Sequence, residues 1–338
     1  MRVVVIGGTN FIGPHVVTAL HVLGHGITVY HRGHHEPELP GDVRHIHSPL
    51  AGIPVLHFPA ELSDPAPDVV VHMFPVGEDD ARAAMARFAG VARRMVALSS
   101  GDVYRAYGRL LGMEAGTAEP VPLDESAPLR EALYPYRRTA AGPTDWTFHY
   151  EKILAEQSVM SHPTLQGTVL RLPAVYGAGD PHRRLRPYIK RMDDRRPAIL
   201  LESAQAKWRW THGYVENVAQ AIALAVVDDR AAGKIYNVGE AETPTVAERV
   251  RRIGELAGWK GEVVSLGSDK LPPHLRSPYE PHQDLVVGTS RLRDELGFTE
   301  VYSIDEGLRR TIEWERGNPP PSGDPGAAEY AAEDAALG

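Results

Sequence analysis

The residues whose types and spacing best define a chemistry stand near the start of the chain, in the run Gly-Gly-Thr-Asn-Phe-Ile-Gly. Gly7 suits a sharp exit from a strand, Gly8 leaves backbone room for a ligand, and Gly13 lets a helix pack closely on a sheet. The first turn of that helix presents unpaired N–H groups and the positive end of its dipole to a diphosphate. The alternative is an ordinary turn between a strand and a helix. The residues that we predict to contact a dinucleotide cofactor here are Gly7, Gly8, Thr9, Asn10, Phe11, Ile12 and Gly13.

The segments around this motif alternate between strand and helix patterns. This alternation predicts an α/β fold with a parallel, doubly wound Rossmann sheet. The predicted strands cover residues 3–6, 27–30, 43–47, 69–73, 95–98, 167–172 and 235–238. Helices are predicted up to residue 23, at 78–93 and 145–161, and within 210–228.

The same patterns predict two lobes and a tail. Residues 1–172 and 211–239 form the dinucleotide-binding Rossmann domain in this interpretation. Residues 173–210 and 240–316 form a smaller, mixed α/β lobe that binds substrate. Residues 317–338 begin with prolines and continue with Ala, Glu and Asp, so they bury little apolar surface and are predicted to be disordered.

Composition narrows the class of protein. A hydrophobic content of 43% and a charged content of 24% are ordinary for a soluble globular chain. The net charge of −8 argues against a broad nucleic-acid surface, and the absence of cysteine excludes disulfides and thiolate sites. The N-terminus is a poor signal peptide, and no apolar run approaches the ~20 residues of a membrane span, so we expect a cytoplasmic protein without a membrane partner. His31, His34 and His35 are joined by no carboxylate or cysteine pattern, and we predict no metal site.

Four segments together give the chain a family resemblance. Besides residues 7–13, they are Leu-Ser-Ser-Gly-Asp-Val-Tyr at 98–104, Arg-Leu-Pro-Ala-Val-Tyr-Gly at 171–177 and Tyr-Asn-Val-Gly at 236–239. On these residues the chain resembles an extended, atypical short-chain dehydrogenase/reductase of the NAD-dependent epimerase/dehydratase type, over about residues 1–316. The glycine motif also resembles that of the chloroplast stem-loop RNA-binding proteins.

The resemblance implies a catalytic serine, tyrosine and lysine. In that family the tyrosine phenol exchanges a proton, the lysine lowers the pKa of the phenol and binds the nicotinamide ribose, and the serine polarises the carbonyl. Ser100 and Lys152 match the serine and the lysine, so the resemblance assigns catalysis to both and a cofactor contact to Lys152. Phe148 stands four residues before Lys152, where the family has its tyrosine.

The missing phenol leaves other acids as candidates. Asp102 lies where sugar-nucleotide dehydratases of this family carry an acidic residue, so the resemblance makes it a candidate catalytic base. Tyr150 is two residues from Lys152, about 200° around a regular helix, and we expect its side chain to point elsewhere. Other candidate phenols are Tyr104, Tyr134 and Tyr136.

The end of the second predicted strand bears on the choice of cofactor. NAD-using members of this family usually have Asp or Glu near His31, which binds the ribose hydroxyls and repels a 2′-phosphate. Here His31 is followed by Arg32, and both side chains can pair with a phosphate. We therefore predict NADP in preference to NAD. The alternative is that Arg32 is solvated or stacks on adenine.

The substrate side fits the family less well. Nucleotide-sugar enzymes of this family commonly have Asn at the position of Ala174, and Arg209 matches their substrate arginine only after a shift of one residue. The basic segment 181–186 either meets an anionic substrate or is a solvated loop.

Three functions follow. The leading prediction is an NAD(P)-dependent oxidoreductase or epimerase/dehydratase that acts on a small polar, sugar-like substrate. A non-catalytic NADP-binding sensor or scaffold is the alternative that Phe148 favours. An RNA-binding protein like the chloroplast relatives is a third, which the negative charge disfavours. The resemblance also allows a homodimer paired through the helix after Asp145, although the apolar face of that helix fits the core equally well.

Overall fold

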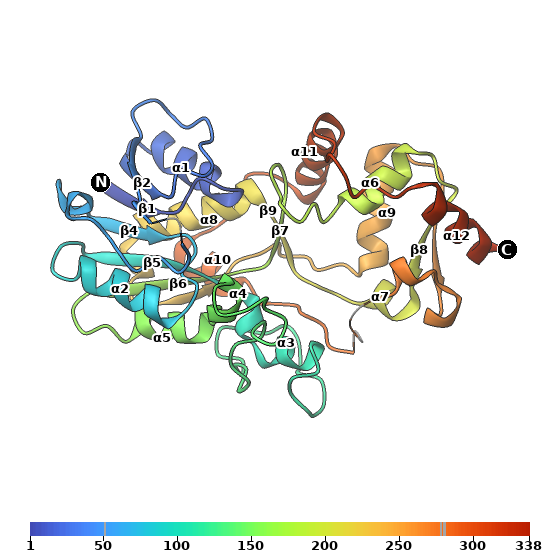
Figure 1. The fold of residues 1–338 in the computed structure, drawn as a ribbon, viewed down its shortest axis with the longest axis horizontal. Helices are drawn as coiled ribbons and strands as arrows, with labels where there is room; N and C mark the ends of the chain where they lie inside the picture. The colour runs from blue at the N-terminus through green and yellow to red at the C-terminus, as the bar shows by residue number, and fades with distance from the viewer. Residues whose placement is uncertain (51, 278, 280–281) are drawn as a thin grey trace.

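A parallel sheet of seven strands forms the centre of the larger lobe of the molecule (Figure 1). The computed structural model describes residues 1–50, 52–277, 279 and 282–338. The strand order is β10-β6-β5-β4-β1-β2-β3, and all six pairs are parallel. The order reverses between β1 and β4, which confirms the predicted doubly wound α/β fold. The strands are β1 (Arg2–Ile6), β2 (Gly26–His31), β3 (Arg44–His47), β4 (Val69–His72), β5 (Arg94–Ser100), β6 (Gln166–Leu172) and β10 (Ile235–Asn237).

Helices cover both faces of the sheet because its central strands are apolar on both sides. α1 (Ile12–Val22) packs beside α8 (Val215–Val227) on one face, and α2 (Glu78–Phe88) packs beside α5 (Lys152–Met160) on the other (Figure 1). Alternate residues of β4 belong to two different hydrophobic cores, as expected of a strand that is buried on both faces of the sheet.

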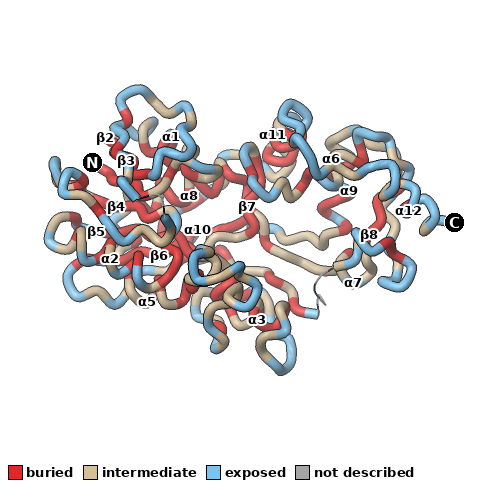
Figure 2. Tube along the Cα trace, viewed as in Figure 1, coloured by how far each residue is buried: buried red, intermediate tan, exposed pale blue. Residues whose placement is uncertain are grey.

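A smaller lobe lies beyond the carboxyl edge of the sheet (Figure 1). Buried residues continue from the sheet through β7 into this lobe, so one core joins the two parts (Figure 2). Within the described residues, no helix is long and apolar enough to cross a membrane. The remaining strands are β7 (Ala174–Tyr176), which pairs with β9 (His212–Tyr214), and β8 (Ala198–Glu202), which pairs with β11 (Glu262–Leu266). The other α-helices before the C-terminal tail are α3 (Arg105–Leu110), α4 (Trp146–His149), α6 (Arg186–Asp193), α7 (Ser203–Lys207), α9 (Val246–Ala257), α10 (Ser290–Leu296) and α11 (Ile304–Gly317).

The C-terminal tail is structured, and the prediction of disorder there is wrong. Residues Ala327–Leu337 form α12, whose buried Glu333 pairs with Arg191 of α6 at 2.6 Å. Asp324, just before α12, pairs with Arg186 at 2.5 Å. The prediction considered only apolar burial, whereas this tail is attached to the lobe through its carboxylates.

Candidate functional site

The glycine motif forms the turn between β1 and α1 that its sequence predicts. Gly7 and Gly8 have φ angles of +88° and +86°, in the left-handed region that favours glycine. A Cβ atom on Gly13 would lie 2.4 Å from the Cα atom of Gly8, so the helix approaches the turn because Gly13 has no side chain. α1 begins at Ile12, so its N-terminus and the positive end of its dipole lie directly after the turn. Within this first turn the Gly13 N–H donates to the Asn10 carbonyl oxygen at 2.9 Å, and Pro14 has no N–H.

A cavity of about 730 Å³ opens beside this turn. Residues 7–12 line one side of it, and Arg32, His34 and His35, which follow β2, line another. Phe74, which follows β4, also lines this cavity. Residues 7–12 and Arg32, which are predicted to bind the cofactor, are thus gathered around one space, with Gly13 packed behind the turn. Lys152, which is also predicted to contact the cofactor, is not among the residues that line it.

His31 lines the same cavity, but its ring is engaged within the protein. Its Nε2 lies 3.0 Å from Nδ1 of His45, and its Nδ1 accepts a hydrogen bond from the Gly33 N–H at 3.2 Å. Burial, and then the neighbouring His47 and His45, lower the pKa of His31. A neutral ring with both nitrogens engaged is a weak partner for a phosphate, so the structure does not favour the predicted phosphate contact of His31.

A second cavity, of about 600 Å³, adjoins the first. Phe74, Trp146 and His182 line both cavities. Ser100 and Asp102 line the second one from the carboxyl end of β5, where open α/β sheets place their sites. The Ser100 Oγ accepts a hydrogen bond from the Asp102 N–H at 3.2 Å.

Tyr150 also lines the second cavity, so the expectation that it points elsewhere is wrong. The predicted helix at 145–161 is interrupted, because α4 ends at His149 and α5 begins at Lys152. Tyr150 and Glu151 between them are extended, with ψ angles of 113° and 94°. The angular spacing of a regular helix therefore does not apply, and the Lys152 Nζ lies 5.5 Å from the centre of the Tyr150 ring.

Glu151 holds this interruption in place. Its carboxylate accepts a hydrogen bond from the Ile153 N–H at 3.0 Å, which caps α5, and another from the Tyr134 N–H. It also pairs with Arg130 at 3.1 Å, and both side chains are fully buried. These contacts fix the backbone from which the Tyr150 side chain enters the cavity.

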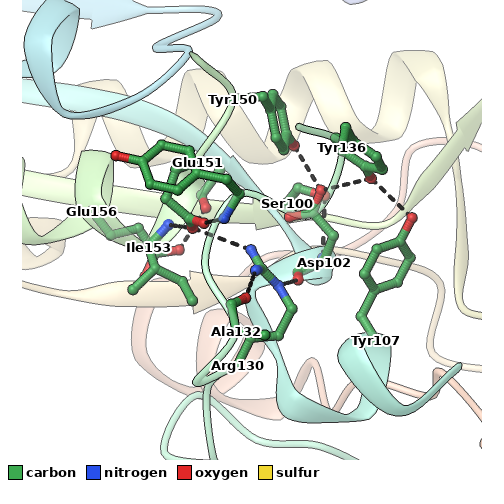
Figure 3. A network of polar contacts seen from close by, with 12 residues as sticks. Ser100, Asp102, Tyr107, Arg130, Ala132, Tyr136, Tyr150, Glu151, Ile153 and Glu156 are labelled. Atoms are coloured by element: carbon green, nitrogen blue, oxygen red, sulfur yellow. Dashed lines mark hydrogen bonds and ion pairs between the residues drawn. The ribbon is translucent and has the colours of Figure 1, made fainter. Parts of the chain in front are cut away.

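Two phenols contact the carboxylate of Asp102, and a third phenol contacts one of these two (Figure 3). The hydroxyls of Tyr150 and Tyr136 donate to its Oδ2 at 2.7 and 3.3 Å, and the hydroxyl of Tyr107 lies 2.8 Å from that of Tyr136. The Asp102 Oδ1 is buried without a partner among the described residues. Burial raises the pKa of Asp102 although Tyr150 opposes this, and burial together with Asp102 raises the pKa of Tyr150. A phenol and a carboxyl in this contact can exchange a proton.

Lys152 is buried next to both cavities. Its Nζ donates to the carbonyl oxygens of Pro75 and Leu98 at 2.6 and 3.2 Å, and it lies 4.7 Å from the centre of the Phe74 ring. Burial lowers the pKa of Lys152 to about 8, and the nearby carboxylates, Asp80 first among them, only partly offset this effect. The two carbonyls hold the ammonium group beside Leu98 and Phe74, which line the first cavity.

The other tyrosine candidates separate into two groups. Tyr136 belongs to the group formed by Asp102, Tyr150, Tyr136 and Tyr107, which we call the Asp102 cluster. Sequence reasoning did not single out Tyr107, because nothing in its local pattern marks it. Tyr104 instead donates to Asn237 at 2.6 Å within the core, and the Tyr134 ring stacks 3.3 Å from the guanidinium of Arg137. Phe148 also packs against this group, with its ring centre 4.7 Å from the same guanidinium carbon.

Another part of the second cavity is lined by basic and aromatic side chains. Arg184 and Trp210 line it and also line a further cavity of about 180 Å³. Arg249 lines this smaller cavity and has one buried terminal nitrogen, Nη1, without a partner among the described residues. Arg209, the residue considered from the sequence, is instead engaged with Asp284 at 2.7 Å.

The doubly wound parallel sheet, with two adjoining cavities beyond its carboxyl edge, defines a Rossmann-type protein. The model of the NAD dependent epimerase/dehydratase family matches residues 3–239, and the chain belongs to that family of enzymes. It is 24% identical to the UDP-N-acetyl-alpha-D-glucosaminuronate decarboxylase of Bacillus cytotoxicus, over 93% of this chain and 98% of that one. It is 25% identical to the 2′-dehydrokanamycin reductase of Streptomyces kanamyceticus, over 80% of this chain and 70% of that one.

Solved structures show the same fold. TunA, an NAD-dependent NDP-hexosamine 5,6-dehydratase involved in tunicamycin biosynthesis, superposes with a TM-score of 0.67 at 20% identity, over 94% of this chain and 98% of that one. The UDP-glucose 4-epimerase of Thermotoga maritima, solved with UDP-glucose, superposes with a TM-score of 0.65 at 18% identity, over 94% and 99% of the two chains.

Proposed function

We propose that this enzyme transfers a hydride between a nicotinamide cofactor and a hydroxyl or ketone carbon of a sugar-like substrate, with the phenol of Tyr150 exchanging the proton. The observation that carries the proposal is the contact between Tyr150 and Asp102 in the cavity that also contains Ser100. This site adjoins the cavity of the glycine turn.

The residues around the first cavity fit the cofactor. The left-handed glycines, the close approach of Gly13 and the start of α1 together suit a diphosphate. When bound, the nicotinamide ring supplies or accepts the hydride. Lys152, whose ammonium group lies beside Leu98 and Phe74 of this cavity, would bind the adjoining ribose.

Ser100, Tyr150 and Asp102 at the second cavity then have distinct roles. Ser100 hydrogen-bonds the reacting oxygen of the substrate. In the oxidation direction, Tyr150 accepts the proton from the substrate hydroxyl and passes its own proton to Asp102. In the reduction direction the two transfers run in reverse. The raised pKa of Asp102 suits a carboxylate that must hold this proton for part of the cycle.

The positive charge of Lys152 gives a testable pH dependence. Because the pKa of Lys152 is about 8, the ammonium is charged below this pH and loses its proton above it. We expect kcat/KM to fall about tenfold per pH unit above that point, since kcat/KM follows ionisations of the free enzyme. A pH–rate profile at a fixed cofactor concentration measures this. A flat profile between pH 7 and 10 would contradict the role of the charge.

NADP is the cofactor that the end of β2 favours. Arg32, His34 and His35 line the cavity where the adenosine ribose of a bound dinucleotide would lie, and a guanidinium is a strong partner for a 2′-phosphate. Arg32→Ala is therefore expected to weaken NADP binding by about 10- to 100-fold, the value of a hydrogen bond to a charged group. NAD binding, measured on the same samples by calorimetry, should change less than about twofold. Equal losses for both cofactors would instead indicate stacking of Arg32 on adenine.

A sugar linked to a nucleotide diphosphate is the substrate class that the second cavity supports. Arg184 and Trp210 line both this cavity and the adjoining smaller one, which Arg249 and Trp208 also line. Both guanidinium groups pair with a carboxylate at 2.7 Å, Arg184 with Asp180 and Arg249 with Glu240. Nη1 of Arg249 has no partner among the described residues, and such a donor beside aromatic rings suits a phosphate group next to a sugar or base. The relatives named above that act on, or are solved with, UDP-linked or NDP-linked sugars agree with this class. Incubation with a panel of such sugars and either cofactor, followed by mass spectrometry and NMR, tests both the substrate and the reaction. Tight cofactor binding without conversion across the panel would favour the sensor function instead.

A further inference from the structure

The parallel pairing of β2 with β3 brings together side chains that are distant in the sequence. His31 lies in register with His47, and residues in register on neighbouring strands point to the same face. Glu36, from the segment after β2, contacts His47, with its Oε1 2.7 Å from Nε2. One possible ligand atom from each of these three residues lies within 4.8 Å of the other two.

We propose that His31, Glu36 and His47 form a binding site for a divalent transition-metal ion such as Zn²⁺ or Co²⁺. Imidazole nitrogens and a carboxylate oxygen are common ligands of Zn²⁺, and three protein ligands leave a fourth position for water or a small ligand. The sequence analysis predicted no metal because no carboxylate or cysteine pattern joins His31, His34 and His35. The ligands come together only through the strand register.

The hydrogen bonds of His31 determine which of its nitrogens is available. Nδ1 accepts the Gly33 N–H at 3.2 Å and therefore carries the lone pair, which leaves the proton on Nε2, 3.0 Å from His45. Ligating histidines usually donate their other N–H to a neighbouring acceptor, which fixes the ring. Here His45 is the acceptor of the Nε2–H of His31, so we assign Nδ1 of His31 as the metal ligand. The metal would replace only the long contact with Gly33.

The three side chains combine one rigid ligand with two adjustable ones. His31 is 5% exposed, whereas the side chains of Glu36 and His47 are 56% and 54% exposed. The ligand atoms of a tetrahedral zinc site lie about 3.3 Å apart. The exposed pair can close around an ion by side-chain rotation while His31 stays in place.

Cobalt binding to the untagged full-length protein tests the site. Visible absorption reports tetrahedral Co²⁺, and calorimetry with Zn²⁺ gives the stoichiometry. We expect one ion per chain, with an affinity reduced more than about tenfold in His47→Ala and in Glu36→Gln. Both variants alter exposed side chains, and circular dichroism verifies that they are folded.

His34→Ala is the matched control, because His34 belongs to the same histidine-rich segment but not to the cluster. Its affinity for Co²⁺ should stay within about twofold of the unaltered protein. Equal weakening in His34→Ala and His47→Ala would show unspecific binding by the segment and overturn the proposal, as would the absence of binding at millimolar Co²⁺. Because no substrate or dinucleotide is added, this result is independent of the proposed enzymatic function.

Discussion

Replacement of Tyr150 by phenylalanine is expected to lower kcat by about 10²- to 10⁴-fold, the usual contribution of a general acid–base group. The substitution removes the only atom that joins the phenol to Asp102, at 2.7 Å, and leaves the ring that packs in the cavity wall. Cofactor affinity, measured by titration on the same samples, should change less than about twofold because the glycine turn is untouched. The turnover assay uses the substrate identified by the sugar panel.

Tyr134→Phe is the control for this substitution. Its ring stacks on Arg137 rather than entering the Asp102 cluster, so loss of its hydroxyl should leave kcat within about twofold. A similar loss of activity in both variants would point to a general disturbance of the segment. Full activity in Tyr150→Phe would remove the phenol from the mechanism.

Glu151→Gln is expected to lower the free energy of unfolding by about 3–5 kcal/mol, the usual cost of breaking a buried ion pair by removing one partner. The side chains of Glu151 and Arg130 are both fully buried, so the substitution leaves a guanidinium charge without its counterion. It also weakens the hydrogen bonds that cap α5 and hold Tyr134. Urea denaturation followed by circular dichroism measures the change.

An exposed pair provides the comparison. Glu78 of α2 pairs with Arg82 at the surface, with side chains 39% and 68% exposed, so Glu78→Gln should cost less than about 1 kcal/mol. A cost of Glu151→Gln no larger than that of Glu78→Gln would show that the buried pair does not hold the interruption between α4 and α5.

The fold and the glycine turn could be predicted because their signals are local. The apolar strands, the turn at 7–13 and the helix after it are each determined by adjacent residues. Ser100 and Asp102 follow a strand whose end lies at the ligand-binding edge of any such sheet, so their shared cavity follows from the topology.

The features that sequence reasoning missed depend on contacts between distant segments. Tyr150 enters the cavity because Glu151, held by Arg130, interrupts a helix that the pattern of apolar residues predicts to be continuous. The tail at 317–338 is held by ion pairs to α6, which composition alone does not show. The histidines of β2 and β3 meet only through their register.

The measurement that tests the central claim most directly is the turnover of the double variant Phe148→Tyr/Tyr150→Phe, compared with Tyr150→Phe alone. The structure places residue 148 against Arg137 and residue 150 beside Asp102. We therefore predict that a phenol at 148 restores none of the lost activity. Recovery to within about tenfold of the unaltered enzyme would show that the catalytic phenol belongs four residues before Lys152, and would contradict the proposed role of Tyr150.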